Sequence, residues 1–316
     1  MNYKTILAVT DLSKSGNEAV HRAATVAVNC AAELRLMYAP IEDEPAWPHW
    51  ESHLRDLART VAATAGHLHG EPGRCGNSVE DIAAEANCAD LMVSMYRRER
   101  QIGTFFKGEW HQRVIRLTRC PLLLTRSNGR LPYAKIVVPV DFSETSPQLV
   151  VHAGRIDDRA DLELFHAISR KDEARLRSTD VSWEVVKTFR SHEENHARQR
   201  LHELAQATDV GGRTLTLSTG SGEPGRQTSM KQQDSGAALI VVGKARRSAA
   251  MDFLCGAVSS RILAWSSADV LIVPHDQRSS TRAAAKRRIA AEMGDGQGAF
   301  LSRSAGRLLR WSAAPR

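Results

Sequence analysis

The chain has 316 residues, of which 42% are hydrophobic and 25% are charged, an ordinary composition for a globular protein. No apolar run approaches the roughly 20 residues that span a bilayer, which argues against a membrane-spanning helix. The five cysteines are an odd number without a close-spaced pair, which argues against a disulfide framework or a CxxC metal site and for a reducing cytoplasm. The first apolar run begins so near Met1 that we expect no signal peptide.

The net charge of +7 comes from one end of the chain. Of the 43 basic and 36 acidic residues, nine basic and two acidic ones lie between Gln277 and Arg316. Residues 1–276 therefore carry 34 of each sign. Because this body is neutral, the charge gives no argument that the folded part binds nucleic acid.

Strands and helices are predicted to alternate along each half of the chain. The halves open with continuous apolar runs, Ile6–Thr10 and Ile136–Val140, which are typical of strands buried on both faces of a parallel sheet. An Asp and a helical stretch follow each run. The later strands are expected at Leu34–Tyr38 and Leu162–His166, near Leu68 and Ser218, at Leu91–Ser94 and Leu239–Val242, and at Leu122–Thr125 and Val270–Val273. The alternation predicts an α/β fold of two open, doubly wound parallel-sheet domains.

The two halves also repeat in sequence. The repeated segments are Lys4–Ser13 with Ala134–Ser143, Ala32–Ala39 with Ala160–Ala167, and the pentapeptide Gly-Glu-Pro-Gly-Arg at Gly70–Arg74 and Gly222–Arg226. They occur in the same order, at a spacing that matches the size of one domain. We therefore predict one domain at residues 1–126, a linker at 127–133, a second domain at 134–275 and a tail at 276–316.

Duplication also predicts how the chain assembles. Two copies of one fold in one chain resemble a homodimer whose subunits have been joined. We expect an intramolecular pseudo-dimer through the last strands, because their apolar side chains would be exposed at free sheet edges. Association of whole chains into a homodimer stays open.

These residues resemble a known family. Each half resembles a universal stress protein (UspA-type) domain, on the opening strand with its terminal Asp, on Ala89–Val93 and Ala238–Gly243, and on the Cys120-Pro121 ending. The resemblance covers residues 1–275 and implies a cytoplasmic stress-response protein with an adenine-nucleotide α-hydrolase-like fold. Glu109-Trp110-His111, with the segment that follows, is similar to the tandem E-type subgroup.

The resemblance also implies a place for ATP. Many members carry Gly, two residues, Gly, nine residues and Gly-Ser or Gly-Thr before the last helix, where backbone amides and the helix N-terminus favour phosphate. In the second half these positions hold Gly243, Arg246, Gly256 and Ala257, so the middle glycine and the hydroxyl are lost. Asp141 would hold the ribose or adenine. Arg246 adds positive charge for phosphates but also obstructs the approach that glycine allows.

The first half departs further from the pattern. Its corresponding positions hold Met95, Arg98, Gly108 and Glu109, and the Glu109 carboxylate should repel a triphosphate. We expect no nucleotide there, and we predict a non-enzymatic protein that acts through partners or a small ligand. An ATP-binding switch that uses the second half alone, with at most slow hydrolysis, is the alternative. A hydrolase or ligase would need a phosphate loop after the first strand, which the sequence there resembles only faintly.

Two short patterns carry competing chemistry. His192–His196 fits H-E-x-x-H, the zinc protease pattern, but at about 100° per residue both histidines point away from the apolar side of their helix. A solvated helix face is the better interpretation. Gly220–Gly225 fits G-x-G-x-x-G, but the next strand ends without the acidic residue that binds a ribose, which favours a tight strand-to-helix turn. We predict no catalytic residue and no metal site.

The basic tail has a weak helical pattern. From Phe300 to Trp311, leucine and alanine share one side and arginine the other, which would suit an acidic partner, a membrane surface or nucleic acid. Four glycines weaken such a helix. We therefore expect residues 276–316 to be disordered in the isolated protein, and deletion of residues 277–316 to leave the melting temperature nearly unchanged.

Overall fold

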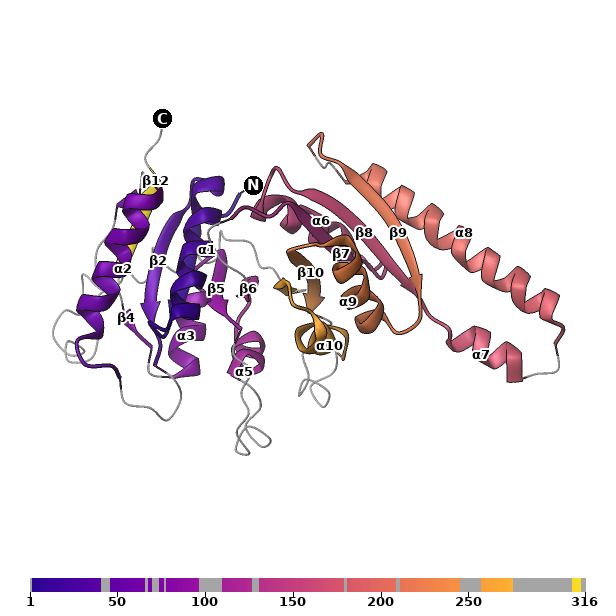
Figure 1. The fold of residues 1–316 in the computed structure, drawn as a ribbon, viewed down its shortest axis with the longest axis horizontal. Coiled ribbons are helices and arrows are strands. Elements are labelled where there is room, and N and C mark those ends of the chain that lie inside the picture. Colours follow the sequence, from indigo (N-terminus) through magenta and orange to yellow (C-terminus); the bar gives the residue numbers. More distant parts are fainter. Residues whose placement is uncertain are drawn as a thin grey trace, which may run out of the picture. The chain divides into compact units, whose positions relative to one another are not determined.

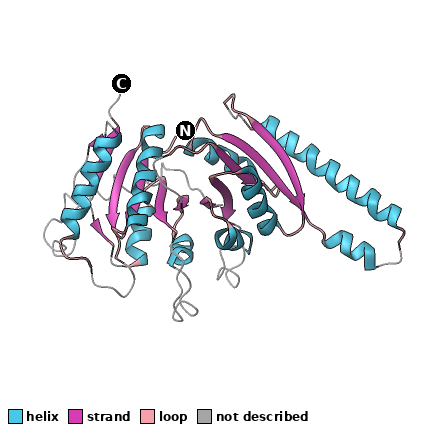
Figure 2. Cartoon of the chain, in the orientation of Figure 1, coloured by secondary structure: helices cyan, strands magenta, loops and turns pink. Residues whose placement is uncertain are grey.

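A computed structural model describes most of the chain in two compact units. The first unit comprises residues 1–132 and 276–316, and the second comprises residues 133–275. The residues that the structure describes are 2–40, 46–65, 68–69, 74–76, 78–96, 110–126, 131–178, 181–208, 211–244, 257–274 and 309–313. Figure 1 follows the chain through both units, and Figure 2 distinguishes their helices from their strands.

The second unit has the simpler sheet. Its strands are β7 (Lys135–Pro139), β8 (Asp161–Ile168), β9 (Leu215–Ser221), β10 (Leu239–Lys244) and β11 (Asp269–Pro274), all paired in parallel in the order β11-β10-β7-β8-β9. The helices are α6 (Ser146–Ile156), α7 (Lys171–Ser178), α8 (Trp183–Ala207), α9 (Pro224–Ser235) and α10 (Ala257–Trp265). Helix α8 runs along β8 and β9, while α9 contacts α10 (Figure 1).

The first unit repeats this plan with a more irregular edge. Its strands are β1 (Thr5–Thr10), β2 (Glu33–Tyr38), β3 (Leu68–His69), β4 (Arg74–Cys75), β5 (Leu91–Met95), β6 (Leu122–Thr125) and β12 (Leu309–Ala313). They follow the order β3-β12-β2-β1-β5-β6, with β4 also paired to β2. The helices are α1 (Lys14–Cys30), α2 (Trp50–Ala65), α3 (Val79–Ala86) and α5 (Trp110–Leu117).

The predicted fold class is confirmed in both units. Strand β1 is buried along its whole length, as expected of a strand covered on both faces. In each unit the chain moves from the first strand to one side of the sheet and then returns to fill the other side. Strand order therefore reverses beside β1 and beside β7. In open α/β sheets, ligands bind at this reversal, outside the carboxyl ends of the strands.

Strand β12 corrects the prediction for part of the tail. Leu309–Ala313 forms a strand antiparallel to β2 and β3, whereas the sequence pattern predicted a helix as far as Trp311 or no structure. The physical reason lies in the sequence pattern of β12 and in the open edge of β2. Apolar and polar residues alternate over Leu309–Ala313, which suits a strand, and β4 pairs only with the last two residues of β2. The rest of that β2 edge would otherwise present unpaired backbone groups.

Deleting residues 309–316 should therefore expose this edge of β2. We expect amide hydrogen exchange in peptides covering Leu34–Leu36 to rise about tenfold, because three residue pairs with β12 are lost. Mass spectrometry of the exchanged protein measures this directly. A deletion of residues 314–316 alone is the control and should leave exchange unchanged. Equal exchange in the full-length and shortened chains would show that β12 does not protect β2.

Candidate functional site

Asp141 follows β7 at the point where the order of strands reverses. Its Oδ1 accepts hydrogen bonds from the Ser143 amide at 3.0 Å and from the Ser146 hydroxyl at 3.1 Å. Desolvation by neighbouring atoms would raise the pKa of the Asp141 carboxyl, but the hydrogen bonds from Ser143 and Ser146 lower it below its ordinary value. The side chain is therefore an oriented, ionised carboxylate at the carboxyl edge of the sheet.

The same loop has a special backbone geometry in both units. Phe142 and Leu12, which follow Asp141 and Asp11, have φ values of 60° and 65°. Bulky residues seldom adopt this left-handed conformation. In the first unit the Asp11 carboxylate accepts from the Ser13 hydroxyl at 2.6 Å and from its amide at 3.0 Å. Each loop thus turns sharply while its carboxylate holds the following residues in place.

Gly243 lies on the strand next to Asp141. Strands β7 and β10 pair in parallel with Ile240 opposite Val137, and Gly243 lies three residues further along β10, near its carboxyl end. A Cβ atom at Gly243 would lie 3.7 Å from a Leu149 methyl group, an ordinary contact. Packing therefore does not require glycine here. The other two predicted ATP residues, Arg246 and Gly256, lie outside the described residues.

In the first unit a side chain stands at the position of Gly243. Met95 ends β5, and its sulfur lies 3.6 Å from the hydroxyl of Ser13. That hydroxyl also accepts the Gly16 amide and caps helix α1. Methionine thus occupies space beside the loop that holds Asp11. Arg98, Gly108 and Glu109 lie outside the described residues.

The repeated pentapeptide forms a tight turn in the second unit, as predicted. Gly222 has φ 138°, and Glu223 then caps helix α9 by accepting the amides of Gly225 and Arg226 at 3.0 and 2.8 Å. Glu223 also pairs with Arg261 at 2.7 Å. Burial would raise the pKa of Glu223, but its bonds to Arg226 and Arg261 lower it. A carboxylate already occupies the amides that a dinucleotide phosphate would need.

The H-E-x-x-H segment lies on α8. His192 is 77% exposed, and its ring stacks on that of His196 at 6.5 Å. No cluster of three or more possible metal ligands occurs within the described ranges. The prediction of a solvated face fits His192. It is incomplete for Glu193 and His196, because both of these side chains line a cavity.

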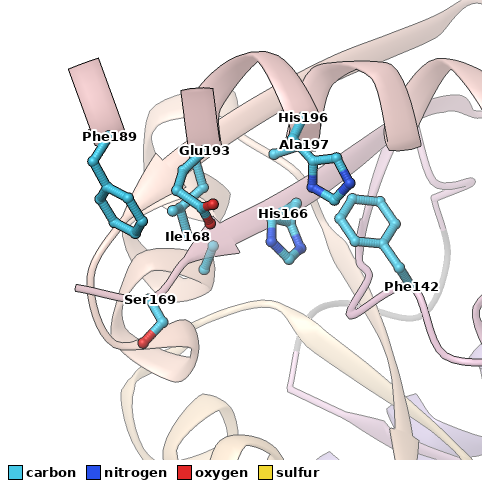
Figure 3. Close-up of a pocket in the computed structure, with 9 residues that line it drawn as sticks. Phe142, His166, Ile168, Ser169, Phe189, Glu193, His196 and Ala197 are labelled. Carbon is cyan, nitrogen blue, oxygen red and sulfur yellow. The ribbon is translucent and has the colours of Figure 1, made fainter. Parts of the chain in front are cut away.

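This cavity was not foreseen from the sequence. It has a volume of about 230 Å³ and lies between the end of β8 and helix α8 (Figure 3). Its lining combines aromatic, imidazole and carboxylate groups with small residues: Phe142, His166, Ala167, Ile168, Ser169, Phe189, Glu193, His196 and Ala197. Phe142, the residue that follows Asp141, thus lines this cavity.

The two units define a tandem, doubly wound α/β protein with a carboxylate after the first strand of each unit. A model described as "Universal stress protein family" matches residues 2–126 and 132–274. The chain therefore belongs to the universal stress protein family. Among helices in the part of the chain that the structure describes, none is long and apolar enough to cross a membrane.

Individual relatives support this assignment. A universal stress protein of Methanocaldococcus jannaschii is 28% identical over 148 residues, which are 46% of this chain and 85% of that protein. A protein of unknown function from Pseudomonas aeruginosa PAO1 has a TM-score of 0.60 at 17% identity, covering 92% of this chain and 98% of its own. A universal stress protein from Archaeoglobus fulgidus has a TM-score of 0.59 at 13% identity, covering 87% and 97%. These two structures share the fold.

Proposed function

We propose that this protein is a non-enzymatic, cytoplasmic stress-response protein that acts by binding a small ligand or a partner through its second unit. The observation that carries this proposal is the Asp141 carboxylate, held by Ser143 and Ser146 at the reversal of strand order. A fixed carboxylate at this edge suits a ligand with hydroxyl or amino donors. Two of the four positions of the phosphate-binding signature are replaced, which weakens any binding of a triphosphate.

The second candidate function is an ATP-binding switch confined to the second unit. It is favoured by the parallel pairing of β7 with β10, since Gly243 lies near the carboxyl end of β10 and Asp141 follows the carboxyl end of β7. The first and third glycines of the ATP signature, Gly243 and Gly256, are retained in the sequence, and Arg246 offers positive charge for the phosphates. Pairing of the two units through their last strands stays a prediction of the sequence.

Titration with a fluorescent ATP analogue tests both functions. We expect no saturable binding to the native protein at micromolar concentration, because the middle glycine and the hydroxyl of the signature are missing. Asp141→Ala and Asp11→Ala are matched variants of the two loops. Saturable binding that Asp141→Ala abolishes and Asp11→Ala preserves would favour the switch. The reverse pattern would show that the roles of the two units are exchanged.

A further inference from the structure

The cavity beneath α8 lies where the first unit is filled by aromatic side chains. The sequence repeat aligns His166 with Tyr38, each near the end of its strand. In the first unit the Tyr38 ring stacks on Trp50 at 5.2 Å and 13°, and its hydroxyl accepts the Trp47 amide at 2.9 Å. These contacts join Tyr38 at the end of β2 to Trp50 of α2 and to the segment before it. The first unit therefore uses this place for packing.

The second unit leaves the corresponding place partly open. His166 is smaller than tyrosine, and its ring contacts Phe142 at 4.3 Å. Across the cavity α8 presents the small side chain of Ala197 together with Glu193 and Phe189 (Figure 3). Because no tryptophan covers His166 among these lining residues, a space of about 230 Å³ remains.

Two polar groups of this cavity, on His166 and Glu193, can accept hydrogen bonds. Nδ1 of His166 lies 2.8 Å from the Val140 carbonyl oxygen, which can only accept, so Nδ1 carries the proton. Burial lowers the pKa of His166, although the Val140 carbonyl and Asp141 oppose that shift. A neutral ring with its proton on Nδ1 leaves Nε2 as an acceptor. Glu193 adds a half-buried carboxylate that points toward the cavity beside His166 (Figure 3).

The neighbouring cationic side chains do not neutralise the Glu193 carboxylate. The Arg200 guanidinium lies over the Phe142 ring at 4.9 Å and donates to the Phe142 carbonyl oxygen at 3.4 Å. Its Nε lies 3.9 Å from Glu203, and Arg200 is not one of the lining residues. His192 approaches Glu193 only at 3.9 Å and is itself 77% exposed. The Glu193 carboxylate is therefore available to a cationic ligand.

Size and chemistry together define the ligand. A volume of about 230 Å³ is below the roughly 300–1,000 Å³ of sites for drug-sized molecules, so one or two rings would fit. Aromatic walls favour a flat molecule, and a carboxylate pairs best with a planar group that donates two N–H bonds. We propose that this cavity binds a small aryl amidinium or guanidinium compound, with Glu193 as its counter-ion and Phe142 and Phe189 around its ring. The site does not depend on nucleotide binding at Asp141.

Benzamidine is the probe for this site, with isothermal titration calorimetry of the full-length protein as the measurement. We expect saturable binding to the native chain and at least about tenfold weaker binding to Glu193→Gln, which removes the charge but keeps the shape. Glu194→Gln is the matched control. Glu194 is the next residue on α8, pairs with Arg198 at 4.0 Å and does not line the cavity, so its loss should leave affinity unchanged.

Further arms separate this proposal from others. Benzamide, a neutral analogue of similar shape, should bind at least about tenfold more weakly than benzamidine. Binding that is unchanged in Glu193→Gln, equal for benzamide, or absent from the native chain would overturn the proposal.

Discussion

Glu163→Ala should destabilise the second unit by about 3 kcal/mol, because it leaves two ammonium groups without their counter-ion. Glu163 lies on β8 with a side chain that is only 1% exposed. Its carboxylate lies 2.9 Å from Nζ of Lys135 and 2.7 Å from Nζ of Lys231, and it accepts the Ser218 hydroxyl at 2.8 Å. The lysines are about one-third exposed, which places the expected loss at the low end of values for buried pairs.

The same network predicts how the stability of the second unit depends on pH. Burial would raise the pKa of Glu163, but hydrogen bonds from Lys231, Lys135 and Ser218 lower it below the usual 4.5. A carboxyl group whose pKa is lower in the folded state stabilises the fold above its unfolded pKa. That contribution is lost as the pH falls from about 4.5 through the folded pKa. Glu163→Ala should therefore flatten the acid limb of the stability curve.

Hydrogen exchange of peptides from β8 in increasing urea measures this effect in the second unit alone, since a chain of two units need not unfold in one step. Asp161→Ala is the control, because Asp161 is an exposed carboxylate on the same strand. It should change stability by less than about 0.5 kcal/mol. Equal protection of β8 in both variants would contradict a stabilising role for Glu163.

The fold could be predicted because burial leaves a clear pattern in the central strands. Strand β1 was expected at Ile6–Thr10 and spans Thr5–Thr10, since a strand covered on both faces is apolar throughout. The edge strands were harder to predict. The third strand of the first unit is only Leu68–His69, and β12 joins that edge from far along the chain. Short strands at an edge bury little, so their sequence pattern is weak.

The two candidate sites also differ in how far the sequence predicts them. Asp141 could be predicted because it follows a recognisable strand. The cavity could not, because His166, Phe142 and Glu193 come from three separate segments that only the fold brings together. The periodicity of α8 identified its most apolar side and left Glu193 with the solvated residues. The available signal was the change from Tyr38 to His166 between two otherwise similar strands.

Restoring the lost signature should create ATP binding in the second unit. In the double variant Arg246→Gly with Ala257→Ser, a glycine would let backbone amides approach phosphate, and a hydroxyl would return to the first residue of helix α10. Two recovered contacts of about 1.4 kcal/mol each correspond to roughly 100-fold tighter binding. The fluorescent ATP analogue used for the native protein measures the gain.

Substitution of Asp141 tests whether that gain in ATP affinity comes from the predicted site. Adding Asp141→Ala to the double variant should remove the new binding, because the carboxylate beside Ser143 and Ser146 would hold the ribose or adenine. Adding Asp11→Ala should leave it intact, since Met95 already stands beside the Asp11 loop in the first unit. If the double variant binds no better than the native protein, replacement of these two residues is not what limits ATP binding. The second unit would then have to be specialised for a different ligand.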